Sequence, residues 1–458
     1  MRKILINLLH EINHYDIIYR TRYRLLRHHS GEKSMIHKLC TLTGIILLLS
    51  AHVALAADWK YVCSNGCDYP SLSAALVQRE PKIFIKAGIY EVSSEILVDY
   101  DNVVIRGESR DQVILRQTAA SDLLAVRKAN YVTVQSLTLD AQTPPAGATV
   151  SPARAAFVAG DTNYVTLEGC RILGSNNIFA VYFAGKTFPP GQATLDAVAR
   201  NDLDQFNVVR DNEVYSTWIG DVLSFSLQTG GQVVNNLVTG GLVAFYMNNN
   251  SICSDNIITD SVSEGIYYSM PANNNQIIRN LIQRPVKAGI NIVTQTEHPV
   301  PVTARSGGLT LQHNRIVDSR YMGIIVNQLA DSVISHNQIE GSDFDGLYFL
   351  RSDRLNVSSN QIRDVGQSVI RPPVPGSSWS NYQDSPIHSD LDLRDSMISQ
   401  NLLMQTASGH AKFGIILVAG VGNLGNTVLN NYIYGTYTAL PLRVDPVENT
   451  VGPQIILP

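Results

Sequence analysis

The sequence has little charge and no long charged helical stretches. Only 16% of its 458 residues are charged, whereas 45% are hydrophobic and 32 are glycine. This composition argues against a helix bundle and, together with many asparagines, favours β structure. The apolar content is sufficient for a large core, in one long domain or in two ordinary ones.

Histidine is scarce beyond the first 56 residues. Five remain, and none is paired at the spacing of metal ligands: His298, His313, His336, His388 and His410. Because a structural or catalytic metal site needs clustered ligands, the sequence predicts no metal site and no cofactor. A Ca²⁺ ion is possible but nothing in the sequence indicates one.

Cysteine is also rare, with five in the chain. Cys63 and Cys67 lie in "CSNGC", around an Asn-Gly turn, and we expect a local disulfide in an oxidising compartment. Two free thiols are the alternative. Cys170 and Cys253 are expected to be small buried hydrophobic residues, and Cys40 belongs to the N-terminal segment.

The N-terminus has the features of a targeting segment. Residues 35–56 contain the basic start "MIHK", an apolar run from Leu39 to Ser50, and the cleavage pattern Ala54-Leu55-Ala56. This order predicts a signal peptide, with residues 1–34 as an untranslated or extra extension and residues 57–458 as the exported domain. An uncleaved anchor is the alternative, although the apolar run is short for a membrane span. The expected location is secreted or periplasmic, without membrane insertion after signal removal.

Removal of residues 1–56 would make the protein acidic. These residues hold 8 of the 35 Lys and Arg and 3 of the 39 Asp and Glu, which leaves 27 basic and 36 acidic residues and a net charge of −9. Such a protein is a poor partner for nucleic acid, because it would be repelled by the phosphate backbone.

A short segment with an Asn between apolar residues recurs along the chain, as in "QIIRNLI", "VISHNQI" and "NVSSNQI". The aligned residues are Asn212, Asn236, Asn256, Asn280, Asn314, Asn337, Asn360, Asn401 and Asn431. The tightest spacings are 20, 24, 23 and 23 residues, and a period in this range predicts a solenoid. A Gly follows four of these Asn nine residues later, at Gly265, Gly289, Gly323 and Gly346.

One coil is therefore expected to run strand, Asn turn, strand, Gly turn, strand, with successive coils stacked as parallel strands. We expect Asn at the turn because it tolerates a left-handed backbone. Its side-chain amide can also bond to the same Asn one coil away, so that the stacked Asn form an internal ladder.

The repeat resembles the right-handed parallel β-helix of the pectin-lyase-like superfamily, over about residues 60 to 455. The opening stretch from "DYPSLSAALVQ" to "NVVIRGESRDQVILRQ" is especially similar to the start of pectin methylesterases. The resemblance implies an all-β chain, a single right-handed parallel β-helix solenoid with an N-terminal capping helix over Ser71 to Gln78.

Four stretches interrupt the repeat, at residues 141–155, 185–206, 294–308 and 366–392. They are rich in Pro, Gly and Ser, and loops on a rigid scaffold commonly carry binding groups. They are expected either to line a groove or only to shield the sides of the solenoid.

The Gly positions predict which side chains face outward on the following strand. The column two residues after each Gly contains Tyr267, Asn291, Ile325 and Tyr348, and Glu264, Lys287, Tyr321, Asp343 and Asp345 lie just before the Gly positions. Arg320 and Arg351 lie at the edges. Together these residues predict a contiguous polar strip, for which an ordinary solvated face is the alternative.

The strip suits an acidic polysaccharide as partner. Tyr267 and Tyr348 would stack on sugar rings, Glu264 and Asn291 would contact the substrate, and Arg320 or Arg351 would neutralise a uronate carboxylate.

Lys287 or Tyr321 would act as base or acid in β-elimination or C5-epimerisation.

Hydrolysis is the alternative reaction, and it requires two carboxylates at a suitable separation. Asp343 and Asp345 could be near enough. Glu264 and Asp345 would be about 14 Å apart, at three coil spacings, which is too far.

Motifs of individual enzyme families are missing. The polygalacturonase motifs are absent apart from "SGHAKFG", and "GIYYSM", "GINIVT" and "GLYFLR" lack the His of periplasmic alginate epimerases. The catalytic motifs of pectin methylesterases are also absent, so no catalytic residue can be carried over. A non-catalytic polysaccharide-binding or envelope assembly scaffold is therefore a further alternative, and the oligomeric state is open.

Overall fold

The computed structural model describes residues 58–119, 121–141, 155–174, 179–188, 194–216, 220–294, 307–369, 384–406 and 410–458. The predicted extension and signal peptide, Cys40 and His298 lie outside these residues, as do most of the interrupting stretches. Residues Trp59–Pro458 form one compact unit.

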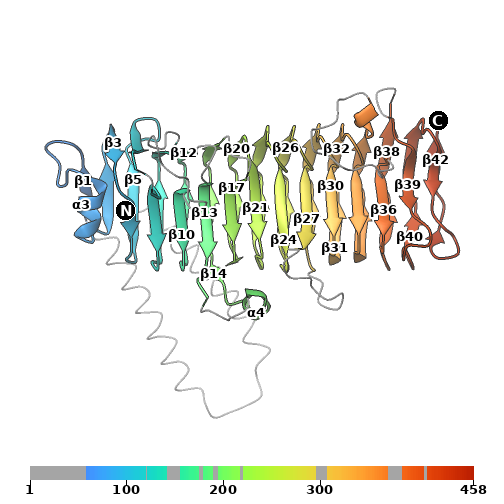
Figure 1. The fold of residues 1–458 in the computed structure, drawn as a ribbon, viewed down its shortest axis with the longest axis horizontal. Coiled ribbons are helices and arrows are strands. Elements are labelled where there is room, and N and C mark those ends of the chain that lie inside the picture. Colours follow the sequence, from blue (N-terminus) through green and yellow to red (C-terminus); the bar gives the residue numbers. More distant parts are fainter. Residues whose placement is uncertain are drawn as a thin grey trace, which may run out of the picture. The chain divides into compact units, whose positions relative to one another are not determined.

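Three long parallel sheets make up the structure (Figure 1). Within the described residues, sheet A has fifteen strands: β1 (Lys60–Val62), β2 (Lys82–Ile85), β5 (Val103–Gly107), β8 (Val132–Gln135), β11 (Thr166–Glu168), β15 (Val208–Arg210), β19 (Gln232–Val234), β22 (Ile252–Ser254), β25 (Gln276–Ile278), β28 (Thr310–Gln312), β31 (Ala330–Ser335), β34 (Asp353–Ser358), β37 (Met397–Ser399), β40 (Thr427–Leu429) and β43 (Thr450–Val451).

Sheet B has fourteen described strands: β3 (Gly88–Val92), β6 (Val113–Gln117), β9 (Thr138–Asp140), β12 (Arg171–Leu173), β16 (Glu213–Tyr215), β20 (Leu237–Thr239), β23 (Ile257–Thr259), β26 (Leu281–Gln283), β29 (Arg315–Val317), β32 (Gln338–Glu340), β35 (Gln361–Arg363), β38 (Leu402–Gln405), β41 (Tyr432–Gly435) and β44 (Ile455–Leu457).

Sheet C has thirteen strands in the same ranges: β4 (Ile96–Val98), β7 (Leu124–Arg127), β10 (Ala155–Gly160), β13 (Phe179–Gly185), β17 (Asp221–Ser226), β21 (Leu242–Tyr246), β24 (Ile266–Met270), β27 (Ile290–Thr294), β30 (Ile324–Asn327), β33 (Leu347–Leu350), β36 (Ile387–Leu391), β39 (Phe413–Leu417) and β42 (Leu440–Arg443). A small sheet pairs β14 (Asp204–Gln205) with β18 (Gln228–Thr229).

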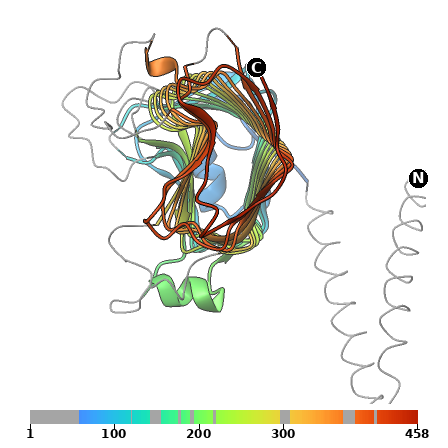
Figure 2. The ribbon, with the colours of Figure 1, turned by 90° about the vertical axis from the view of Figure 1, so that its right-hand side faces the viewer.

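Each coil contributes one strand to each sheet, in the order C, A, B, and each strand pairs in parallel with its equivalent in the next coil. One coil runs through β24, β25, the turn at Asn280, β26 and Gly289 before β27 begins. Viewed along the stack, the coils superimpose on one outline (Figure 2). The solenoid predicted from the Asn repeat is confirmed.

The Asn ladder is confirmed at all nine positions. Each Asn donates from Nδ2 to Oδ1 of the next Asn at 2.9–3.0 Å. The ladder starts where the backbone N–H of Cys170 donates to Asn212 Oδ1, and it ends with Asn431 Nδ2 donating to Gln454 Oε1. It gives hydrogen-bond partners to turn groups that are buried away from water.

The expectation that the Asn itself is left-handed was wrong. The residue before each ladder Asn has the positive φ, between 55° and 59°, at Asp211, Asn235, Asp255, Arg279, His313, His336, Ser359, Gln400 and Asn430. The ladder position needs an inward amide more than it needs conformational freedom, so the left-handed backbone falls on the preceding, solvent-facing residue.

A second set of side chains caps the turn between sheets C and A, and the sequence analysis missed it. Ser251 Oγ accepts from Gly231 N–H at 3.1 Å, and Asn275 Oδ1 accepts from Ser251 N–H at 2.8 Å. Further along, Asn426 Oδ1 accepts from Ser396 N–H at 3.0 Å. Ser and Asn share the same position here, because a hydroxyl or an amide oxygen serves equally well as acceptor.

The four repeated Gly residues allow close packing and have no positive φ. A Cβ added at Gly323 would lie 2.4 Å from Ile339 Cγ2 and 2.7 Å from the carbonyl oxygen of Gly346. Equivalent contacts occur at Gly265, Gly289 and Gly346. A residue with a side chain is therefore excluded from this corner unless its neighbours move.

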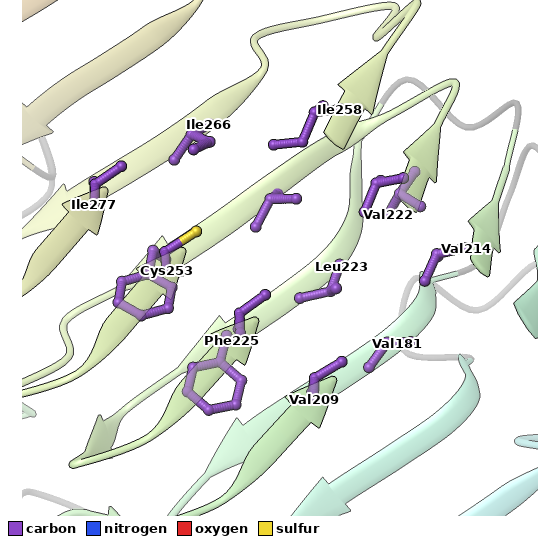
Figure 3. Packing of buried hydrophobic residues seen from close by; sticks show 14 of the residues in the cluster. Val181, Val209, Val214, Val222, Leu223, Phe225, Cys253, Ile258, Ile266 and Ile277 are labelled. Carbon is purple, nitrogen blue, oxygen red and sulfur yellow. The ribbon is translucent and has the colours of Figure 1, made fainter. Parts of the chain in front are cut away.

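The interior of the solenoid is apolar and stacked. Phe157, Phe183, Phe225 and Phe245 follow one another on successive strands of sheet C, with ring centroids 5.2–5.6 Å apart. Figure 3 shows Phe225 among the buried side chains of neighbouring coils. Cys170 and Cys253 are buried free cysteines in the same core, as expected.

The N-terminal end carries a helix and a disulfide. Helix α3 (Leu72–Val77) begins at Ser71, whose Oγ accepts from Ala74 N–H, and it buries Leu72, Ala75 and Leu76 in the core. It packs against β1, β2 and β4. Cys63 and Cys67 form the predicted disulfide, with Cα atoms 5.5 Å apart.

Candidate functional site

The interrupting stretches leave the solenoid at both edges of sheet C. Residues 142–154 and 370–383 connect sheet B to sheet C, and residues 186–206 and 295–306 connect sheet C to sheet A. The first edge also holds the 3₁₀ helix η2 (Gln367–Val369), and the second holds helix α4 (Thr194–Arg200). Figure 2 shows α4 and η2 on opposite sides of the coil outline. The outer face of sheet C is therefore the face bordered by insertions.

The predicted outward column is confirmed in register. Tyr267 pairs with Asn291, Asn291 with Ile325, Ile325 with Tyr348, and Tyr348 with His388. Most of these side chains are buried or half-buried although they point away from the core. Two polar clusters occur along this face, three coils apart.

The first cluster, here called the Asn291 cluster, comprises Asp221, Tyr246, Glu264, Tyr267, Lys287 and Asn291. Its centre is Glu264, which is 7% exposed. Glu264 Oε1 lies 3.5 Å from Lys287 Nζ and accepts from Asn291 Nδ2 at 3.3 Å, and Oε2 accepts from the Ser263 hydroxyl. The carboxylate is thus fully occupied by its neighbours.

Asp221 and two tyrosines complete the Asn291 cluster. Burial raises the pKa of Asp221 to about 6; a hydrogen bond from Tyr246 opposes this shift, and Glu264 adds to it. Burial and then the charge of Glu264 raise the pKa of Tyr267. Both phenols therefore stay protonated, and the Tyr246 and Tyr267 rings lie 5.5 Å apart.

The second cluster, here called the His388 cluster, comprises Asp345, Tyr348, Asp384, His388, Asp390 and Lys412. Asp345 and His388 have no exposed side-chain surface, and His388 Nδ1 lies 3.1 Å from Asp345 Oδ2. Asp345 Oδ1 accepts from Ser385 N–H at 2.7 Å. The carboxylate therefore fixes the proton on Nδ1 and leaves Nε2 as the basic nitrogen of a neutral ring.

Nε2 of His388 lies 4.0 Å from Asp390 Oδ1, and Tyr348 donates to Asp390 Oδ2 at 3.1 Å. The Tyr348 ring is 4% exposed and meets the His388 ring edge-on at 5.1 Å, so its faces are not open to solvent. Burial and then Asp345 raise the pKa of Asp384 to about 6, against the charges of Lys412 and His388. A base, a phenol and a protonatable carboxyl thus lie together.

Four buried polar atoms on this face have no hydrogen-bond partner within the described residues: Ser269 Oγ, Asn291 Oδ1, Asn327 Oδ1 and His388 Nε2. They lie on β24, β27, β30 and β36, and we call them the polar track. Buried polar atoms in native proteins nearly always have partners. The polar track therefore indicates a face built to receive hydrogen bonds from a ligand or from water.

The remaining predicted site residues lie elsewhere. Asp343 is 2% exposed and its Oδ2 lies 2.7 Å from Arg320 Nε, so both charges are engaged in an ion pair. Tyr321 packs against Phe344 with ring centroids 5.8 Å apart, beside Met322 and Tyr348. Arg351 is exposed at the end of β33. The structure thus divides the predicted strip into two clusters and one ion pair.

Sequence reasoning missed His388 as a site residue. The strand that carries it follows a long insertion, and Pro386 stands where earlier coils have Gly, since Leu347 N–H donates to Pro386 O. The Gly ruler therefore ended at Gly346. Counting outward from the ladder residue Asn401 could have recovered the register.

No group of three or more His, Cys, Asp or Glu side chains in the described part of the chain is arranged to hold a metal ion. No helix in that part is long and apolar enough to cross a membrane.

These features define a parallel β-helix protein of the pectin-lyase-like type. A family model described as "Right handed beta helix region" matches residues 300–440, which include the His388 cluster. No curated protein matches the chain.

Several solved structures share the fold. The chain is similar to the catalytic unit of a GH87 α-1,3-glucanase from Streptomyces thermodiastaticus strain HF3-3, at 12% identity and a TM-score of 0.53, over 82% of this chain and 67% of the glucanase. It is similar to the Dettilon tailspike protein at 11% identity and 0.53, over 84% of this chain and 64% of the tailspike. For the siphovirus 9NA tailspike receptor-binding domain the values are 11% and 0.52, over 84% and 75%. At these identities the likeness shows the fold alone.

Proposed function

We propose that the protein is an exported β-helix protein that acts on a polysaccharide, as a lyase or C5-epimerase of a uronate-containing polymer. The observation that carries the proposal is the His388 cluster, in which a carboxylate orients a buried imidazole with its second nitrogen unpartnered in the described structure. The similar glucanase supports it as an enzyme of this fold whose name specifies a polysaccharide substrate.

In this proposal His388 Nε2 removes the proton from the carbon beside the uronate carboxylate, and the electron pair moves into that carboxylate as an enolate. Tyr348 then supplies a proton. In a lyase the proton goes to the departing glycosidic oxygen, and in an epimerase it goes to the opposite face of the carbon. Lys412 and Arg351 are the cations available to balance the carboxylate, because Lys287 and Arg320 are engaged with Glu264 and Asp343.

The test is proton NMR of the purified protein with acidic and neutral polysaccharides in heavy water. New alkene signals would identify a lyase, and deuterium beside the carboxylate without chain cleavage would identify an epimerase. His388→Gln should lower the rate by at least about 100-fold, as expected for loss of a general base. His336→Ala, an exposed histidine on another face, is the matched control and should retain the rate.

Hydrolysis is a second candidate, favoured by one observation. Asp384 has its pKa raised to about 6 beside Asp345, which is the arrangement of a general acid next to a second carboxylate. New reducing ends without alkene or deuterium signals would support this reaction and place it on Asp384. Unchanged spectra for every polymer would leave a non-catalytic binding or envelope assembly scaffold as the better account.

We further propose that residues 35–56 direct export to the periplasm or medium and that α3 caps the open first coil. Export predicts a mature protein that begins at Ala57, which N-terminal sequencing of the periplasmic and culture fractions would check. The capping proposal rests on the burial of Leu72, Ala75 and Leu76 against the first strands.

A further inference from the structure

The Asn291 cluster takes no part in the proposed chemistry, yet it occupies the same face as His388. Asn291, Ile325, Tyr348 and His388 occupy one column on consecutive strands, so three coil spacings separate Asn291 from His388. That separation is about 14 Å along the solenoid axis. A polysaccharide that follows the polar track to His388 would pass directly over Asn291.

The net charge of the Asn291 cluster is unfavourable for a second uronate. Two carboxylates, Asp221 and Glu264, face one cation, and Lys287 is already within 3.5 Å of Glu264. Glu264 adds a repulsive interaction to Asp221 and to Tyr267. A sugar carboxylate placed here would meet an excess of negative charge with no cation left to balance it.

The hydrogen-bonding groups lead to the same conclusion. The unpartnered atom of Asn291 is Oδ1, which can only accept, because Nδ2 donates to Glu264. A carboxylate is also only an acceptor, so it cannot satisfy Asn291. Ser269 Oγ is fully buried and has no partner within the described residues, and it can donate or accept. Sugar hydroxyls, which do both, match this pair.

We propose that the Asn291 cluster is a distal subsite for an uncharged, hydroxyl-bearing sugar unit. Combined with a uronate at His388, which rests on the function proposed above, it makes the substrate a heteropolysaccharide in which charged and uncharged units are interspersed. A polyuronate would fit one cluster and be repelled by the other.

The test is calorimetric titration of the full-length protein with three oligosaccharides of equal length. The probes are oligogalacturonate, cello-oligosaccharide and hyaluronan oligosaccharide, in which uronate alternates with an uncharged sugar. We expect the alternating probe to bind at least about 10-fold more tightly than oligogalacturonate. Asn291→Ala and Ser269→Ala should each weaken the alternating and neutral probes about 3- to 10-fold, the range expected for loss of one hydrogen bond.

A charge variant provides a gain of binding. Glu264→Gln removes one carboxylate and releases Lys287, so it should strengthen oligogalacturonate binding about 10-fold. Ser399→Ala, a buried serine of sheet A, and Asn356→Ala, an exposed asparagine of the same sheet, are the matched controls and should change nothing. Unfolding midpoints of all variants would be measured alongside, so that a misfolded variant is recognised.

Oligogalacturonate binding equal to or tighter than the alternating probe would overturn the subsite, and so would Asn291→Ala and Ser269→Ala without effect, since water alone would then satisfy those atoms. Absence of binding by both probes with uncharged units would overturn it as well. The proposed reaction fails differently. If His388→Gln leaves turnover intact while Asn291→Ala weakens binding, the subsite stands and the assigned base falls.

Discussion

The Asn ladder allows the cost of one side chain to be worked out from its contacts. Asn314 is fully buried. Its Nδ2 donates to Ile277 O at 2.8 Å and to Asn337 Oδ1 at 3.0 Å, and its Oδ1 accepts from the backbone N–H and the Nδ2 of Asn280, both at 3.0 Å. Asn314→Ala removes all four bonds. At about 0.5–1.5 kcal/mol for each net bond, the loss is about 2–6 kcal/mol.

The measurement is urea unfolding of Asn314→Ala, followed by circular dichroism. Because a solenoid can open locally, exchange of the Asn280 amide proton is the more direct probe, and it should accelerate with the same free energy. Asn356→Ala is the control, since Asn356 is exposed on β34 and should change stability by less than about 0.5 kcal/mol. If the two variants lose the same stability, the ladder does not hold the coils together and the reasoning is refuted.

Two further predictions concern packing and pH. Gly323→Ala should cost about 1–3 kcal/mol through its clash with Ile339, and Ile339→Ala in the same chain should cost less than the sum of the two single changes; additive losses would contradict the contact. Asp384 has a folded pKa of about 6 against an ordinary value of 3.8, so the native state binds the extra proton and the wild type loses stability as pH rises from about 4 to about 6. Asp384→Asn should therefore be up to about 3 kcal/mol more stable relative to wild type at pH 7.5 than at pH 3.5, as measured by urea unfolding at both values; equal differences at the two pH values would contradict the shift.

The repeat allowed the fold to be predicted because every coil needs the same group at the same corner. A buried turn requires an amide that donates and accepts along the stack, and only one residue type meets that need at Asn280 and Asn314. The turn between sheets C and A left no such mark, because Ser251 and Asn275 satisfy it with different side chains.

The candidate site was harder to predict because partners come from different coils. Glu264, Lys287 and Asn291 were all identified, but their mutual contacts depend on side-chain reach across a coil spacing. Asp343 and Asp345 are two residues apart in sequence and have different partners, Arg320 and His388. Alternation along the chain gives the direction of a side chain, and it does not say what the next coil offers it.

The ladder also has an electrical direction. Each ladder amide donates toward the C-terminal end and accepts from the N-terminal side, from Asn212 through Asn431. Backbone bonds in parallel strands alternate in direction and largely cancel, whereas these aligned amide dipoles add, as peptide dipoles do in an α-helix. Since bonds in such a chain polarise one another, the row acts as a single dipole through the core, with its positive end at the last coil and its negative end near Cys170.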